Sequence, residues 1–376
     1  MSSSRQIQSR QALNEITPYS PGKPIWEVQR EYGLEQVVKL ASNENPLGPS
    51  PKALQAIAEK LPELHRYPDV AASELRQALA GKLGLSESEL IVTNGADELI
   101  TLVSETYLEP GDEIVIPSPV FSEYEFGARL MGATIITVPM EPGFRYSVER
   151  LLASVTDRTK SLYLCSPHNP AGTYLPKGEL QRSLDILPGH VLVIYDAAYS
   201  HYATAEDYSD GMEFVRAGYP IMVLQTFSKI YGLAGIRVGF GAAPEGIIRS
   251  IFQVKEPFNV NALAQAAAAA ALTDDEHLEA SRRMNTQGRE RLYAAFRKLG
   301  IGYTESMSNF VLAEFGDGAD RLVRELMAVG VIVRYGIGWG SPGHIRISVG
   351  SPEENGRLIE ALTAILAKTE NAPKGA

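Results

Sequence analysis

A lysine follows two hydroxyl-bearing residues at the end of an apolar run. Lys229 comes after Thr226 and Ser228, and residues 221–224 before them have the pattern of a buried strand. Arg237 stands eight residues further on. Open α/β sheets bind ligands at the carboxyl ends of their strands, so the lysine is expected at such an edge. Because an amine can form a Schiff base, and two hydroxyls with a guanidinium suit a phosphate monoester, the pattern predicts a pyridoxal phosphate site.

Four further residues follow other predicted strands and supply groups that this cofactor needs. Asp196 ends the apolar run 191–195, where a buried carboxylate requires a partner such as a protonated pyridine nitrogen. Tyr199 is expected to donate a hydrogen bond to the cofactor's phenolate oxygen. Asn169 is expected to hold that oxygen and a substrate carboxylate, and Phe121 to stack on the ring. Taken alone, each residue is also explained by a turn, a cap or core packing.

Anion-binding groups are predicted at two more places. A helix is expected to begin at Ala96 and Asp97, where free backbone NH groups can seat an anion. Arg346 alternates with Ser348 on a predicted strand, and its guanidinium suits bidentate binding of a carboxylate. Arg334 ends the preceding strand and is expected to hold a second anionic group.

Composition narrows the class of protein. A net charge of −10 over 376 residues argues against nucleic acid or an anionic membrane surface as the main partner. The single cysteine, Cys165, fits a reducing compartment. The first ten residues lack the apolar segment of a secretory signal, and no apolar run approaches the roughly 20 residues of a membrane span. The six histidines show no metal-ligand spacing. We therefore expect a cytoplasmic protein without a metal.

The arrangement of apolar runs predicts the fold. Seven short runs alternate with helical or loop stretches, which indicates an α/β fold whose mostly parallel seven-stranded sheet is flanked by helices. The runs cover residues 90–93, 113–116, 134–138, 161–165, 191–195, 221–225 and 237–241.

Three regions are predicted along the chain. Residues 1–50 contain several prolines and little periodicity, and are expected to form an N-terminal arm. Residues 51–275 are expected to form the large cofactor-binding domain, in which Ser73 is a plausible N-cap of a helix. Residues 276–376 are expected to contain an interdomain helix and a small C-terminal α+β domain.

These motifs together resemble the class I/II, fold-type I pyridoxal phosphate aminotransferases. The shared features are Ser-Lys with an arginine eight positions later, Asn-Pro-x-Gly, Asp-x-x-Tyr and a C-terminal arginine. The resemblance runs from about residue 16 to about residue 366. Within this class, the chain is most similar to the histidinol-phosphate aminotransferase family. The similar segments are residues 41–48, 66–69, 94–98, 226–239 and 256–261.

The resemblance implies a role for each site residue. Lys229 would be the Schiff-base lysine and proton carrier, and Asp196 would pair with the pyridine nitrogen. Asn169 and Tyr199 would hold the phenolate oxygen, and Phe121 would stack on the ring. The phosphate would be bound by the backbone NH groups of Ala96 and Asp97 together with Thr226, Ser228 and Arg237.

The resemblance also implies a substrate and an assembly. Tyr67 would reach the phosphate of the other subunit, which implies a homodimer. Arg334 would bind the substrate phosphate and Arg346 the carboxylate of 2-oxoglutarate or glutamate, because histidinol phosphate has no carboxylate. The implied activity is a two-stage transfer of an amino group from histidinol phosphate to 2-oxoglutarate, a reaction of histidine biosynthesis.

Departures from the family pattern leave other functions open. Ala197 stands where the family usually has glutamate, His168 where it usually has asparagine, Ala171 where it usually has threonine, and Phe121 where it often has tyrosine. The alternatives are an aromatic amino acid (phenylalanine or tyrosine) aminotransferase and a pyridoxal phosphate-dependent decarboxylase of a phosphorylated amino acid. A ligand-sensing module of a transcription regulator would need a DNA-binding domain, for which the residues before Ala41 are too few and too poor in helical pattern.

Replacing the predicted Schiff-base lysine tests the central assignment. Lys229→Ala is expected to abolish both amino transfer and the visible absorbance of bound pyridoxal phosphate, because the amine that joins the cofactor's aldehyde is removed. Single-turnover kinetics and absorption spectra of the purified variant measure the two properties. Unchanged turnover with unchanged absorbance would show that another residue holds the cofactor.

Overall fold

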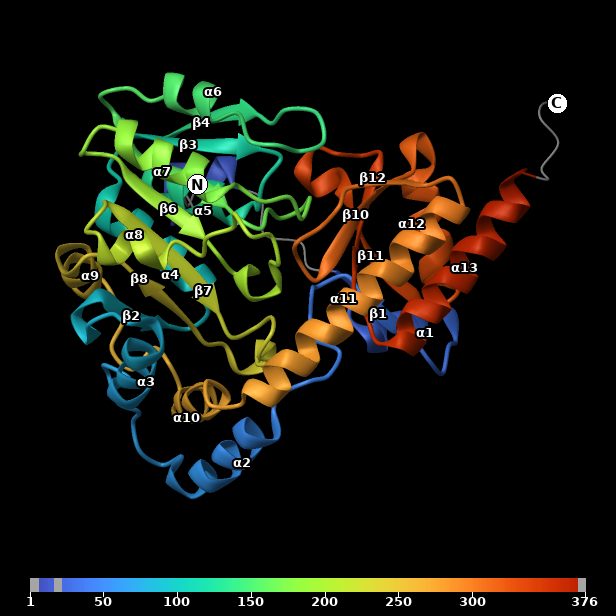
Figure 1. Cartoon of the computed structure of the whole chain (residues 1–376), viewed down its shortest axis with the longest axis horizontal. Helices are drawn as coiled ribbons and strands as arrows, with labels where there is room; N and C mark the ends of the chain where they lie inside the picture. The colour runs from blue at the N-terminus through green and yellow to red at the C-terminus, as the bar shows by residue number, and fades with distance from the viewer. Residues whose placement is uncertain (1–6, 17–21, 371–376) are drawn as a thin grey trace, which may run out of the picture.

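A seven-stranded β-sheet lies at the centre of the larger of two lobes (Figure 1). The structure is a computed structural model that describes residues 7–16 and 22–370. The strand order is β2-β8-β7-β6-β5-β3-β4, and only β8 runs antiparallel to its neighbours in this sheet. The strands are β2 (Leu90–Thr93), β3 (Glu113–Ser118), β4 (Thr134–Pro139), β5 (Thr159–Cys165), β6 (Leu192–Asp196), β7 (Ile221–Thr226) and β8 (Gly239–Ala242). The predicted α/β fold class is therefore confirmed.

Helices cover both faces of this sheet because successive strand residues point in opposite directions. In β7, Ile221 and Val223 pack into one hydrophobic cluster, while Met222 and Leu224 pack into another. The first cluster is covered by α3 (Ser73–Leu83), α6 (Val148–Ala153), α7 (Lys177–Ile186), α8 (Met212–Arg216) and α10 (Ala262–Ala271), and the second by α4 (Ala96–Tyr107), α5 (Glu123–Met131) and α9 (Glu245–Phe252).

Two local predictions in the large lobe are wrong. Arg237 was placed in a strand, but its φ of 59° is left-handed and incompatible with extended backbone, so β8 begins only at Gly239. Ser73 is the first residue of α3 rather than its N-cap, which is Ala72. The backbone NH groups of Ala71 and Ser73 instead donate hydrogen bonds to the carboxylate of Asp69. These hydrogen bonds lower the pKa of that carboxyl group.

The smaller lobe contains a five-stranded sheet with the order β1-β11-β12-β10-β9. Its strands are β1 (Val38–Leu40), β9 (Gly302–Tyr303), β10 (Phe310–Glu314), β11 (Val331–Tyr335) and β12 (His344–Ser348). The sheet packs with α12 (Ala319–Ala328), α13 (Pro352–Glu370) and the C-terminal half of α11 (Asp275–Lys298). Figure 1 shows α11 running from the large lobe into the small one.

The N-terminal segment contributes to the small lobe. Residues 1–50 were expected to form an arm, but residues 25–32 form helix α1 (Ile25–Tyr32), and β1 pairs in parallel with β11. A three-residue strand is too short to show a period in the sequence, and its partner lies almost at the other end of the chain. The arm is therefore partly an element of the C-terminal sheet.

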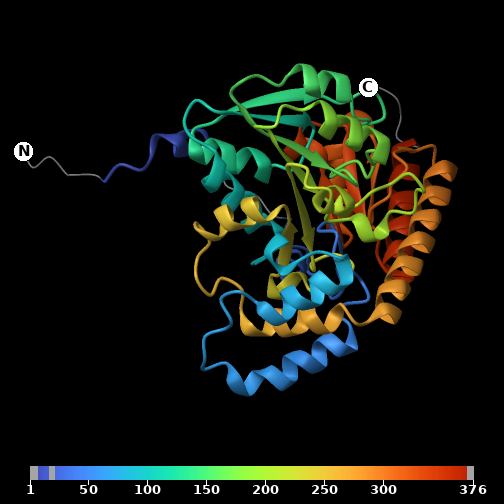
Figure 2. The same cartoon turned by 60° about the vertical axis from the view of Figure 1, so that its left-hand side comes forward.

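The edge of the large lobe is built from two helices that are distant in sequence. Helix α2 (Pro51–Lys60) packs on α10, and Figure 2 shows this pair below the rest of the lobe. Within the described ranges, no helix combines the length and apolarity needed to cross a membrane. The same residues contain no cluster of histidine, cysteine and acidic side chains arranged to hold a metal ion.

Candidate active site

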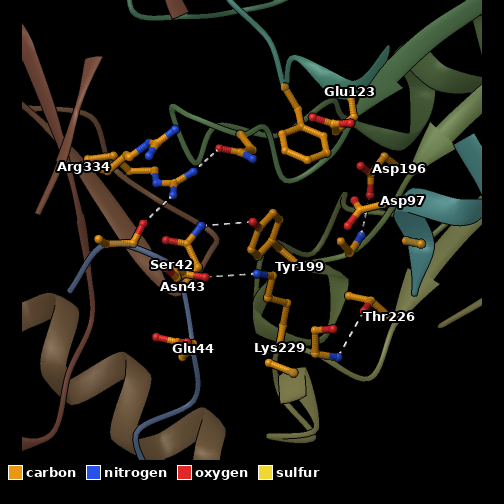
Figure 3. Close-up of a pocket in the computed structure, with 18 of the residues that line it drawn as sticks. Ser42, Asn43, Glu44, Asp97, Glu123, Asp196, Tyr199, Thr226, Lys229 and Arg334 are labelled. Carbon is orange, nitrogen blue, oxygen red and sulfur yellow. Dashed lines mark hydrogen bonds between the residues drawn. The ribbon is translucent and has the colours of Figure 1, made fainter. Parts of the chain in front are cut away.

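A pocket of about 440 Å³ lies between the large sheet and the small lobe (Figure 3). All but one of the predicted site residues line it. They are Ala96, Asp97, Phe121, Asn169, Asp196, Tyr199, Thr226, Ser228, Lys229, Arg237, Arg334 and Arg346. Tyr67 does not line the pocket: its side chain is 82% exposed and stacks on Phe258 with ring centroids 4.6 Å apart.

One end of the pocket gathers hydrogen-bond donors around the first turn of α4. Arg237 donates to the hydroxyl of Ser228 at 3.3 Å, and its other terminal nitrogen lies 3.3 Å from the Asp97 carboxylate. Gly95 precedes the helix with a φ of +89°, and a Cβ on it would stand 2.5 Å from the guanidinium of Arg237. Glycine is thus needed both for the backbone and for the guanidinium to approach the helix N-terminus. This arrangement suits a phosphate group.

The pocket also contains a buried carboxylate. Asp196 is 7% exposed and accepts hydrogen bonds from the Tyr124 hydroxyl at 2.6 Å and the Ala198 NH at 3.0 Å. Burial raises the pKa of this carboxyl group, and the hydrogen bond from Tyr124 opposes that rise. A cationic ring nitrogen would stabilise the ionised form, as the chemistry of pyridoxal phosphate requires.

Lys229 lines the same pocket. Figure 3 shows its amine beside the Tyr199 ring, with a hydrogen bond of 3.2 Å to the carbonyl oxygen of Ser42. Burial, and next the positive charge of Arg346, lower the lysine's pKa to about 8. An appreciable fraction of the amine is therefore uncharged near neutral pH, as a nucleophile or general base must be.

Two arginines form the small-lobe wall. Arg334 and Arg346 are opposite each other in the β11–β12 pairing, and Arg346 donates to Asn169 Oδ1 at 2.5 Å and to the Ala41 carbonyl at 2.9 Å. Both guanidinium groups lie over the indole of Trp339, at 4.9 Å for Arg346 and 5.9 Å for Arg334. Two neighbouring cations over one aromatic ring make a strong site for an anionic substrate group.

The residues at this site fit pyridoxal phosphate. Phosphate donors, a carboxylate for the ring nitrogen and an amine with a lowered pKa all line the pocket. Gly239 provides a further test of fit, because a Cβ there would stand 2.7 Å from the Ala96 nitrogen and displace the helix that supplies the phosphate seat. The three features occur in one pocket, which a single coincidental turn or cap would not explain.

Several polar and aromatic residues at or beside the pocket were not predicted. Ser42, Asn43, Glu44 and Glu123 line it, while Tyr124 and Trp339 contact predicted residues. The turn-forming composition of residues 40–48 predicts that backbone there approaches something, and this was the available signal for the first three. An aromatic residue such as Tyr124 has the same sequence pattern as any core position, so its contact with Asp196 was visible only in the structure.

Comparisons with known proteins agree with this geometry. Residues 35–362 match the family described as aminotransferase class I and II. The chain is 47% identical over 359 residues to a histidinol-phosphate aminotransferase of Moorella thermoacetica, covering 95% of this chain and 93% of the relative. It is 42% identical to a histidinol-phosphate aminotransferase of Anoxybacillus flavithermus, covering 96% and 98% of the two chains.

Solved structures show the same architecture. The histidinol-phosphate aminotransferase of Sinorhizobium meliloti in complex with pyridoxal-5'-phosphate superimposes with a TM-score of 0.88 at 26% identity, covering 98% of this chain and 100% of that one. An aspartate aminotransferase from Thermus thermophilus with maleate has a TM-score of 0.84 at 24% identity, with 96% and 100% covered, and is similar in fold.

The lowered pKa of Lys229 predicts a pH dependence of cofactor capture. Only an uncharged amine reacts with an aldehyde, so the rate of capture by cofactor-free protein is expected to rise with pH and to level off above about 8. Arg346→Gln removes a charge that lowers this pKa and should move the inflection to higher pH. Stopped-flow absorbance measures both, with the surface variant Arg150→Gln as control. An inflection unmoved by Arg346→Gln would contradict the electrostatic explanation.

Proposed function

This chain belongs to the class I and II aminotransferases, it is a pyridoxal phosphate-dependent aminotransferase, and we propose that its substrates are histidinol phosphate and 2-oxoglutarate. The predicted resemblance and cofactor are thereby confirmed. The observation that carries the substrate proposal is the pair Arg334 and Arg346 over the Trp339 indole, facing Lys229 across the pocket. Two guanidinium groups at this position suit a substrate phosphate in one stage and a carboxylate in the other. The reaction would belong to histidine biosynthesis.

We propose the following roles for the chain's own groups in cofactor binding and proton transfer. The α4 N-terminus with Thr226, Ser228 and Arg237 binds the phosphate of the cofactor. Asp196 keeps the ring nitrogen protonated, and Tyr124 orients that carboxylate. When bound, pyridoxal phosphate supplies a ring that accepts electrons from the substrate's Cα–H bond. Lys229 anchors the cofactor and carries the proton, for which an amine with a pKa of about 8 is suited.

The remaining groups orient the ring and the substrate. Asn169 and Tyr199 lie where they would hold the phenolate oxygen, and Phe121 lines the pocket where it would cover the ring's face. Asn169 also accepts the hydrogen bond from Arg346, so one amide joins the cofactor side of the pocket to the substrate side. This link would align a substrate carboxylate with the reacting centre.

We propose that two copies of the chain form a homodimer with Tyr67 reaching the partner's site. Tyr67 and Phe258 form an exposed aromatic stack outside the pocket of their own chain. Further exposed apolar side chains lie in the same part of the chain, namely Leu54, Leu61, Leu64 and Val70. Exposed apolar side chains gathered in this way are typical of an interaction surface. We place this dimer in the cytoplasm, which fits its single buried cysteine.

Replacing Arg334 tests the substrate. Arg334→Gln should lower kcat/KM for histidinol phosphate by about 10- to 100-fold, because a hydrogen bond to a charged group contributes about 1.5–3 kcal/mol. The value for unphosphorylated histidinol should change much less. Steady-state kinetics with both substrates and with phenylalanine measure the preference, and Arg150→Gln serves as control. Equal losses of kcat/KM for histidinol phosphate and histidinol, or a preference of the wild-type protein for phenylalanine, would contradict the substrate proposal.

Mixing two impaired variants tests the shared site. Lys229→Ala should be inactive, and Tyr67→Ala should bind the cofactor about tenfold more weakly through loss of a hydrogen bond to its charged phosphate. The two variants are unfolded and refolded together at limiting cofactor. Each hybrid dimer then has one intact site, which combines Lys229 from the Tyr67→Ala chain with Tyr67 from the Lys229→Ala chain. Activity should return toward about one quarter of the wild-type value, the statistical share of intact sites in a random C2 mixture. No recovery beyond the sum of the separate variants would place Tyr67 outside the partner's site.

A further inference from the structure

Asn43 connects the two lobes within the strap, which we define as residues 41–45. Its side chain is only 1% exposed. On the small-lobe side, its backbone NH donates to Ser348 Oγ at 2.8 Å, and its carbonyl accepts from Asn309 Nδ2 at 2.9 Å. Its side-chain Oδ1 accepts from Ser348 Oγ at 2.9 Å, while Nδ2 donates to the Tyr199 hydroxyl at 3.0 Å (Figure 3). Every polar group of this residue is engaged.

The backbone alone does not require an amide here. Asn43 has a φ of 56°, in the left-handed region that asparagine and glycine adopt more readily than other residues. Glycine would satisfy this geometry and keep both backbone hydrogen bonds. The side-chain amide therefore has a role beyond shaping the turn.

The hydrogen bonds have a direction that matters at Tyr199. An amide NH₂ group is only a donor, so the Tyr199 oxygen accepts from Asn43. A phenol has one proton, which is then free to point away from Asn43 and into the pocket. The amide is held in this orientation because Ser348 donates to its oxygen.

We propose that Asn43 is a positioning residue that directs the Tyr199 proton into the pocket, toward the phenolate oxygen of bound pyridoxal phosphate. The inference rests on the proposed role of Tyr199. A donor at that oxygen stabilises its unprotonated form and lowers the pH at which the bound cofactor titrates.

The same amide ties the cofactor side of the pocket to the substrate-binding strand. Ser348 lies on β12 two residues after Arg346, and alternate strand residues share a face. A chain of hydrogen bonds therefore runs from Ser348 on this strand through the Asn43 amide to the phenol of Tyr199.

The test is a pH titration of the visible absorbance of the holoenzyme. Asn43→Gly keeps the left-handed backbone and removes the amide. It should raise the titration midpoint by about one pH unit, the equivalent of about 1.4 kcal/mol. Tyr199→Phe should shift the midpoint in the same direction. The double variant should match Tyr199→Phe alone, because both changes remove the same interaction.

Two further variants keep the result interpretable. Asn45→Ala breaks hydrogen bonds of the same strap to Ile230 and Ser281, which do not involve Tyr199, and should leave the midpoint unchanged. Ser348→Ala leaves the strap sequence intact and releases the Asn43 oxygen, so it should produce a smaller shift of the same sign even if Asn43→Gly folds poorly. Thermal denaturation of the cofactor-free proteins reports folding separately.

Three outcomes would overturn the inference. One is a midpoint unmoved by Asn43→Gly, and another is an equal shift in Asn45→Ala, which would indicate general loosening of the strap. The third is a shift that persists fully when Asn43→Gly is combined with Tyr199→Phe. Each of these outcomes can be distinguished from failure of the substrate proposal, because the titration uses holoenzyme without histidinol phosphate.

Discussion

A buried guanidinium at the boundary of the two lobes contributes to the electrostatics of this site. Arg346 is 7% exposed, donates hydrogen bonds to an amide oxygen and a backbone carbonyl, and lies over the faces of Phe310 and Trp339. Neutral acceptors offset the loss of water only in part. A substrate carboxylate or phosphate bound here would form charge-assisted hydrogen bonds with this guanidinium.

After burial, that charge is the largest influence on the pKa of Lys229. Arg346 depresses the pKa of Lys229, whereas Asp97 and Glu44 act in the opposite direction. Binding a substrate anion to the guanidinium would cancel part of its effect and raise the basicity of the lysine. Such a change is useful in a reaction where the same amine accepts a proton and then returns it. Under the proposed roles of Arg346 and Lys229, one Coulombic interaction would connect substrate binding with proton transfer.

The sequence allowed much of the large lobe and its pocket to be predicted, for a physical reason. Strands buried on both faces appear as continuous apolar runs, as at residues 221–226, and polar side chains at their carboxyl ends must meet at one edge. Contacts between distant segments leave no such local pattern. The pairing of β1 with β11 and the bond from Tyr124 to Asp196 are of this kind. Arg237 was misplaced because its left-handed backbone has no signature in a run of apolar and glycine residues.

The position of β1 has a consequence for the order in which the molecule is made. Its hydrogen-bonded partner, β11, is synthesised near the end of translation, whereas the seven-stranded sheet is complete once residue 242 has left the ribosome. Once α9 and α10 have also emerged, the large lobe can fold while the strap beside Lys229 still lacks its neighbours on the small-lobe sheet. A nascent chain would hold the phosphate seat and the lysine before it holds the arginines. Cofactor capture can precede completion of the substrate side, so that binding pyridoxal phosphate would act as an early step of assembly as well as a requirement of catalysis.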